Sequence, residues 1–300
     1  PWFIQSANNQ NNYRDWYIWS ENNPGFTGPW GQNIWHYNQG NYYYGLFWSG
    51  MPDLNYEHQS VKQEMINIAN FWLNKGVDGF RLDAIKYLIE DASNLENTPA
   101  TFSLIEDFNS AYKYTSSKSF TIGEVWSNTN FVIPYVQNGR LDACFDFDLA
   151  SNIINSVNSG SSAGLQQQIL TIRESYPALQ FGTFLTNHDM DRVYNKLGYN
   201  NEKMKLAASI YLTMPGIPFI YYGEELGMVG TGSHENIRRP MQWSSSTNSG
   251  FTNSIPWKSI GNNYLTNNVE IMSNNDHSLM NHYKKLIKID PKIKKYVNSN

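Results

Sequence analysis

The stretch VDGFRLDA, residues 77–84, lies between two segments with helical periodicity and is typical of a short buried strand. Because side chains alternate across a strand, Phe80 and Leu82 fall on one face, where they can pack under helices. Arg81 and Asp83 fall on the other face. We expect these two to pair, and a neighbouring guanidinium keeps a carboxylate ionised, as a nucleophile requires. On this strand alone, a buried ion pair that only fixes packing is an equally good interpretation.

The segments around this strand alternate between helical and strand-like patterns. Upstream, apolar residues recur at helical spacing from about Gln59 until Gly76, a typical helix stop. Downstream, the patterns predict helices near 98–114, 130–137, 165–175, 202–213 and 278–289, and strands near 119–126, 143–149, 180–189 and 218–223. This alternation predicts an α/β fold with a parallel sheet, either doubly wound or a (β/α) barrel. About five strands are visible, whereas a closed barrel of this kind needs eight.

Composition argues against several classes of protein. The chain has 300 residues and a formal net charge of −4, whereas duplex-DNA binders usually carry a basic excess, so we expect no nucleic-acid partner. The longest apolar stretch, 210–222, contains Pro215 and Pro218 and is shorter than the ~20 residues of a membrane span, so we expect no span. The one cysteine, Cys144, allows no intramolecular disulfide. No Gly-rich phosphate loop follows any strand, which disfavours nucleotide binding.

Two further predicted strands also end in carboxylates. Glu124 lies among apolar neighbours, where burial would favour its protonated form, as suits a general acid. Asp189 ends another strand, next to His188. Since the carboxyl ends of barrel strands form the active face, Asp83, Glu124 and Asp189 should converge there. Two close carboxylates of unlike character are the machinery of retaining glycoside hydrolysis, and a structural polar network is the competing interpretation.

Five segments, in order along the chain, resemble the α-amylase family of glycoside hydrolases. GFRLDA (79–84), GEVW (123–126) and FLTNHD (184–189) are similar to the motifs that end the family's fourth, fifth and seventh barrel strands. MPDLN (51–55) resembles the motif near the end of the inserted domain B, and GIPFIYYGEE (216–225) resembles the eighth-strand motif. One such match would be weak, whereas five over nearly the whole chain are specific.

The resemblance implies a role for each strand-end residue. Asp83 is implied to be the nucleophile and Glu124 the acid/base. Asp189 is implied to bind sugar hydroxyls and stabilise the transition state. His188 is implied to contact the sugar at the cleavage site, and Arg81 to orient Asp83.

The same resemblance suggests substrate-binding residues after the fourth and fifth strands. Lys86 looks like the family's α-amylase lysine for the leaving-side sugars. Its neighbour Tyr87 departs from the histidine common in amylases, so that subsite can differ here. Trp126, beside Glu124, is a further candidate for substrate binding. Metal ligands are unknown from the sequence.

Parts of the family's pattern have no counterpart in this chain. We find no match to the third-strand Asp–Asn–His motif or to the C-terminal β-sandwich. The resemblance therefore implies a partial (β/α)₈ barrel, strands four to eight: residues 1–57 as the late part of domain B, 58–290 as the barrel units, and 291–300 as the start of a truncated C-terminal region. A structural calcium ion is possible, with ligands partly outside the chain. We expect the 300 residues alone not to be a competent enzyme.

The resemblance implies retaining endo-hydrolysis of α-1,4-glucosidic bonds in starch-like glucans and maltooligosaccharides. Two alternatives remain, an exo-acting α-glucosidase or glucanotransferase of the same family, and a non-catalytic binding subunit. Non-catalytic relatives typically lose one or more of the three carboxylates, and this chain keeps all three. Because starch cannot enter a cell, we expect an extracellular or cell-surface enzyme, and a monomer at full length.

Overall fold

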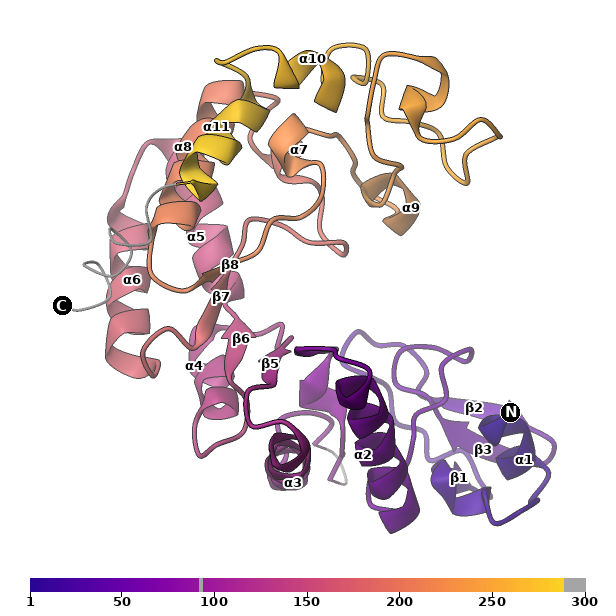
Figure 1. The fold of residues 1–300 in the computed structure, drawn as a ribbon. Helices are drawn as coiled ribbons and strands as arrows, with labels where there is room; N and C mark the ends of the chain where they lie inside the picture. Colours follow the sequence, from indigo (N-terminus) through magenta and orange to yellow (C-terminus); the bar gives the residue numbers. More distant parts are fainter. Residues whose placement is uncertain (92–93, 289–300) are drawn as a thin grey trace. The chain divides into compact units, whose positions relative to one another are not determined.

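The computed structural model describes residues 1–91 and 94–288, which form two compact units (Figure 1). The first unit contains Pro1–Val125 together with Gln137–Asp142, and the second contains Trp126–Val136 and the chain from Ala143 onward. The segment 291–300 and the end of the helix expected near 278–289 lie outside the described residues. Within the described residues, no helix is both long and apolar enough to cross a membrane.

The first unit begins with a small antiparallel sheet. Its strands are β1 (Trp19–Ser20), β2 (Trp35–Asn38) and β3 (Asn41–Tyr44), in the order β1-β3-β2, after α1 (Trp2–Ala7) and the 3-10 helix η1 (Arg14–Trp16). Gln39 and Gly40 both have positive φ, 47° and 93°, which suits the two-residue turn between β2 and β3. The expected loop-rich segment with short strands is therefore present. Its identity as the end of a domain B stays a prediction.

Two parallel strands and two long helices complete the first unit. The strands β4 (Gly79–Leu82) and β5 (Phe120–Gly123) pair from Gly79↔Phe120 to Leu82↔Gly123. The helix α2 (Gln59–Asn74) begins where the His58 side chain accepts a hydrogen bond from the Ser60 amide, and ends before Gly76 at φ 93°. The helix α3 (Pro99–Thr115) is capped by the Thr98 hydroxyl. All four elements were expected, although both strands are shorter than predicted.

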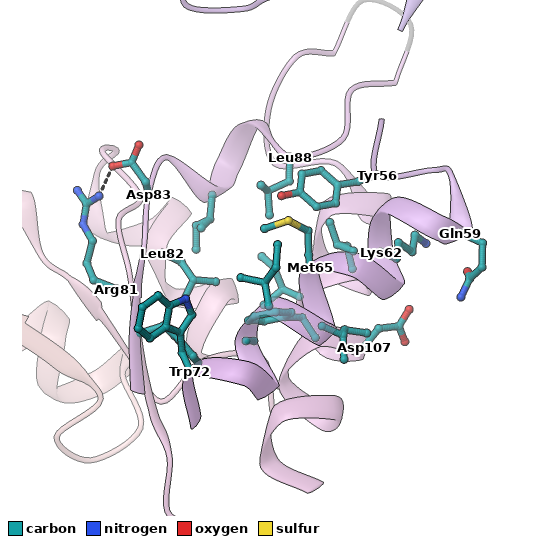
Figure 2. Close-up of a pocket in the computed structure, with 18 residues that line it drawn as sticks. Tyr56, Gln59, Lys62, Met65, Trp72, Arg81, Leu82, Asp83, Leu88 and Asp107 are labelled. Atoms are coloured by element: carbon teal, nitrogen blue, oxygen red, sulfur yellow. Dashed lines mark hydrogen bonds and ion pairs between the residues drawn. The ribbon is translucent and has the colours of Figure 1, made fainter. Parts of the chain in front are cut away.

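An apolar cavity of ≈ 530 Å³ lies among α2, β4 and α3. Figure 2 shows Met65 and Trp72 of α2 on the same side of β4 as Leu82, while Arg81 and Asp83 point the other way. Side-chain alternation along β4 thus divides the strand into an apolar and a charged face, as predicted.

The second unit also contains parallel strands covered by helices (Figure 1). The strands β6 (Ala143–Phe145), β7 (Phe181–Thr183) and β8 (Ile217–Pro218) pair in the order β6-β7-β8. The longer helices are α5 (Phe147–Ser159), α6 (Ala163–Ser175), α8 (Asn201–Thr213) and α11 (Leu279–Ile287). The short helical segments are α4 (Thr129–Val132), η3 (Ile133–Val136), α7 (Val193–Lys196), η4 (Glu224–Leu226), α9 (His234–Ile237), η5 (Thr247–Gly250) and α10 (Val269–Ser273).

Three strand predictions in this unit were too long, and one helix was missed. The strand expected over 143–149 ends at Phe145, because the Asp146 carboxylate caps a helix by accepting from the Leu149 amide. The strands expected over 180–189 and 218–223 are β7 and β8, with only three and two residues. Parallel strands alternating with helices confirm the α/β class in each unit.

Candidate active site

Arg81 and Asp83 form an ion pair at the end of β4, drawn in Figure 2. Arg81 Nη1 donates to Asp83 Oδ1. The pairing was predicted. The strand was also expected to be buried, which is wrong for its charged face, because the Asp83 side chain is 68% exposed. Asp83 therefore presents an accessible carboxylate that is oriented by a cation.

The same guanidinium contacts Glu124, the residue that follows β5. Arg81 Nη2 lies 3.0 Å from Glu124 Oε1, and the Glu124 side chain is only 9% exposed. The other carboxylate oxygen, Oε2, accepts a hydrogen bond of 3.2 Å from the Ala84 amide. One cation thus joins two carboxylates from adjacent parallel strands, an exposed one and a buried one.

Ala84 has an unusual backbone conformation between these groups. Its φ is 43° and its ψ 38°, the left-handed region that non-glycine residues seldom adopt. Backbone hydrogen bonds on both sides hold this conformation. The Glu124 amide donates to the Leu82 carbonyl, and the Ile85 amide donates to the Glu124 carbonyl. Such strain persists where the surroundings over-determine it and often accompanies functional sites. Here the turn directs the Ala84 amide toward Glu124.

In consequence, the Ala84 amide holds one oxygen of the buried carboxylate while Arg81 holds the other.

Lys86 and Tyr87 lie in the 3-10 helix η2 (Ile85–Tyr87), just after this turn. Lys86 Nζ pairs with Glu96 Oε2 at 2.7 Å and lies 4.8 Å from the centre of the Tyr87 ring. The Tyr87 ring in turn meets Trp30 and Phe47 edge to face. Burial, followed by the nearby Glu96 carboxylate, raises the pKa of Tyr87 above its usual range. The two predicted residues thus lie at an aromatic cluster, and no local pattern predicted that Trp30 and Phe47 would join it.

Asp189 belongs to the second unit, where three basic side chains surround it. Arg238 Nη2 lies 2.6 Å from Oδ1, His234 Nδ1 lies 3.2 Å from Oδ1, and His188 Nε2 lies 3.1 Å from Oδ2. The Asp189 backbone amide donates a hydrogen bond to Asn187 Oδ1 at 2.9 Å, which helps to fix the chain at this residue. His188 was predicted as a neighbour. Arg238 and His234 were missed because they lie more than forty residues further along the chain.

Trp126 is half exposed and stacks on Phe147, with ring centres 4.8 Å apart and planes at 15°. Phe147 is the first residue of α5, so the Asp146 cap that begins this helix also places the ring under Trp126. The structure therefore brings together Arg81, Asp83 and Glu124 in one unit. It brings His188 to Asp189 in the other. The expected convergence of all three carboxylates stays a prediction.

Among residues 1–91 and 94–288, no group of three or more His, Cys, Asp or Glu side chains could hold a metal ion. The described residues thus offer no metal site built from these side chains. The calcium ion that the resemblance implied stays a prediction.

Comparison with known proteins agrees with the motifs. The family model for the α-amylase catalytic domain matches residues 1–297. Alpha-amylase 3 of Dictyoglomus thermophilum is 38% identical over 303 residues, which cover 99% of this chain and 58% of that protein. The crystal structure of an α-amylase from H. orenii superimposes with a TM-score of 0.88 at 37% identity, covering 100% of this chain and 62% of that one.

More distant relatives have other activities in their names. The 4-alpha-glucanotransferase of Thermotoga maritima is 32% identical over 258 residues, which cover 82% of this chain and 54% of that protein. This chain thus spans a little more than half the length of these relatives. With a family model that matches nearly every residue and a relative at 38% identity, the chain belongs to the α-amylase family of glycoside hydrolases.

Proposed function

We propose that the protein hydrolyses α-1,4-glucosidic bonds within starch-like glucans and maltooligosaccharides, with retention of the anomeric configuration. The observation that carries this proposal is the Arg81 guanidinium, which joins an exposed carboxylate on Asp83 to a buried one on Glu124. Retaining glycosidases use two neighbouring carboxyl groups of unlike character, one as nucleophile and one as acid and then base.

Asp83 is the nucleophile in this proposal. Its carboxylate is open to substrate and oriented by Arg81, so it can attack the anomeric carbon and form a covalent ester with the sugar. Glu124 gives its proton to the glycosidic oxygen as that bond breaks, which releases the leaving sugar. The ionised Glu124 then takes a proton from water, whose oxygen attacks the anomeric carbon and frees Asp83.

The remaining predicted residues are proposed to bind the substrate. Asp189, oriented by Arg238 and the two histidines, is suited to accept hydrogen bonds from sugar hydroxyls. His188 is proposed to contact the sugar at the cleavage site. Lys86 and Tyr87 are proposed to face the leaving-side sugars, and the exposed ring of Trp126 offers a surface on which a sugar could stack.

Transfer to a second glucan is the main alternative. The relative named 4-alpha-glucanotransferase is 32% identical, against 38% for the relative named Alpha-amylase 3. Both activities begin with the same covalent step, and they differ in whether water or a sugar hydroxyl then attacks. Trehalose synthase/amylase and oligo-1,6-glucosidase relatives, at 28% and 27% identity, are less similar. We therefore place hydrolysis first and transfer second.

The architecture supports further proposals about the whole protein. We propose that the parallel strands are units four to eight of a (β/α)₈ barrel, that 1–57 are the late part of an inserted domain B, and that 58–290 are catalytic. The size of starch favours action outside the cell or at its surface. A calcium ion and a monomeric state are also proposed, on the resemblance alone.

Product analysis with the full-length protein tests the proposed reaction. Maltoheptaose should be cleaved faster than isomaltose, and early products should span several lengths, since the enzyme acts within the chain. Proton NMR should first detect the α-anomer of the new reducing end. Faster cleavage of isomaltose, first release of the β-anomer, or products longer than the substrate would each contradict hydrolysis of α-1,4 bonds with retention.

A further inference from the structure

A polar cavity of ≈ 640 Å³ lies in the second unit, among α7, α9 and the loops around 229–231 and 259–267. Five asparagines line it: Asn195, Asn236, Asn262, Asn263 and Asn267. The lining residues, all in the described part of the chain, include no carboxylate and none of the residues proposed above for catalysis or substrate binding. The cavity is therefore separate in its lining residues from the proposed catalytic and substrate-binding residues.

One amide in this cavity is incompletely bonded. Asn263 Nδ2 donates to the Gly227 carbonyl at 2.8 Å, so the side chain is held in a fixed orientation. Its Oδ1 is buried and, within the described residues, has no hydrogen-bond partner. A buried acceptor without a donor costs free energy, which marks this wall of the cavity as incompletely satisfied within the described chain.

An aromatic ring stands at the edge of the same cavity. Tyr199 lines it, is 60% exposed, and has φ 58°, a left-handed conformation that is strained for a bulky residue. Its position is fixed, because its amide donates to the Tyr194 carbonyl and its hydroxyl accepts from Asn195 Nδ2 at 2.9 Å. The ring is thus held rigidly while one side of it stays open to solvent, as a stacking platform requires.

The lining chemistry favours a neutral ligand over an anion. Arg239 is the charged residue among those that line the cavity, and its terminal nitrogens already donate to Ser259, Ile260 and Asn236. The amides of Asn236 and Asn267 are likewise bonded within the protein, whereas Asn262 is exposed and offers both a donor and an acceptor, which matches the paired character of sugar hydroxyls. Rigid amides beside an open ring fit a pyranose chain, whose faces are apolar and whose edges carry hydroxyls.

We propose that this cavity is a second, non-catalytic binding site for an α-glucan chain. The choice of an α-glucan rests on the proposed function, whereas the cavity's suitability for a neutral sugar chain does not. Binding there would hold a long glucan on the protein while another part of it is cleaved. Short substrates, which cannot reach two places at once, would gain nothing from it.

Binding of β-cyclodextrin, measured by isothermal titration calorimetry on the full-length protein, tests the proposal. Tyr199→Ala removes the platform, and Asn262→Trp places a large side chain at the cavity from an exposed position. Tyr199→Ala should weaken β-cyclodextrin binding about tenfold, the size expected for losing one good ring contact, and Asn262→Trp should weaken it at least as much by filling the cavity. Tyr114→Ala is the matched control, because Tyr114 is 95% exposed and lies on α3 in the other unit.

Activity on two substrates separates this proposal from the proposed function. Both variants should lose activity on amylose while hydrolysis of 4-nitrophenyl maltotrioside stays at the wild-type rate. Wild-type β-cyclodextrin affinity in folded Asn262→Trp protein would overturn the second site, whatever the activity. A protein that hydrolyses neither substrate, but whose β-cyclodextrin affinity falls in both variants, would keep the second site and overturn the proposed function.

Discussion

Two buried glutamates, Glu124 and Glu224, follow parallel strands in different units and have very different partners. Glu124 receives a cation, Arg81, on one oxygen and a peptide amide on the other. Glu224 receives the hydroxyls of Tyr211 and Tyr283 on Oε1, while its buried Oε2 has no partner among the described residues. Burial raises the pKa of Glu224 to about 7.

The difference shows that a carboxylate after a strand is not by itself a sign of catalysis. Tyr211 lies on α8 and Tyr283 on α11, so Glu224 joins two helices to η4 within the protein interior. Glu124 instead lies beside an exposed carboxylate that a substrate could reach. The partners of each glutamate, rather than its place after a strand, indicate its role.

The largest effect should come from removing the proposed nucleophile. Asp83→Ala should lower kcat on maltoheptaose by roughly 10⁴-fold or more, because no other group can form the covalent ester. The melting temperature should stay close to that of the wild type, since Asp83 is exposed. Substantial remaining activity would mean that Asp83 is not the nucleophile. The contrast between the two glutamates would then lose its basis, because it rests on Glu124 lying beside Asp83.

Replacing each glutamate by glutamine tests the comparison directly. Glu124→Gln should lower kcat on maltoheptaose by roughly 10²- to 10⁴-fold, the usual contribution of a general acid. A substrate with a good leaving group needs no proton, so it should still react with Asp83, and mass spectrometry should detect the covalent adduct. Glu224→Gln is the matched control and should keep near-wild-type kcat. Equal losses in the two variants would contradict the assignment of Glu124.

The stability of the protein should depend on the charge of Glu224. Its pKa rises from the ordinary 4.5 to about 7 in the folded state, so the folded protein binds the extra proton between these values. The contribution of this group to the free energy of unfolding is therefore largest below pH 4.5 and falls as the pH rises to about 7. The loss should be on the order of 3 kcal/mol.

Glu224→Gln should remove this dependence, because the amide stays neutral and still accepts from both tyrosines. Urea unfolding at several pH values measures the difference between wild type and variant. Between pH 4.5 and about 7, the free energy of unfolding of the wild type should fall relative to that of the Glu224→Gln variant. A difference that stays constant with pH would mean that Glu224 is not protonated in the folded protein.

A smaller effect is expected at Lys86, the cation that Glu96 and Tyr87 hold beside the Asp83 turn. Lys86→Ala should raise KM for maltoheptaose about tenfold, as for loss of one charged hydrogen bond, with little change in kcat. Lys113→Ala provides the control, since Lys113 also pairs with a carboxylate, Asp142, in the same unit. A similar rise in KM in both variants would show that the effect is structural.

Local patterns were enough to predict the elements around β4, but not where strands end in the second unit. The Arg81–Asp83 pair follows from alternation over three residues, so the sequence could predict it. The strand expected over 143–149 failed because Phe147 and Leu149 are apolar in either a strand or a helix, and the Asp146 cap decided between them. Contacts such as Arg238 with Asp189 depend on tertiary folding over 49 residues and have no local signal.

The position of Arg81 has a consequence for charge during the proposed reaction. In the form that the proposed reaction requires, Asp83 is negative and Glu124 carries a proton, so with the Arg81 guanidinium their charges sum to zero. After the ester forms, Asp83 is neutral and Glu124 has lost its proton, and the sum is again zero. The negative charge has moved from the carboxylate paired with Arg81 Nη1 to the carboxylate paired with Arg81 Nη2. Electroneutrality is thus conserved through the glycosylation step, so we expect its rate to respond little to ionic strength.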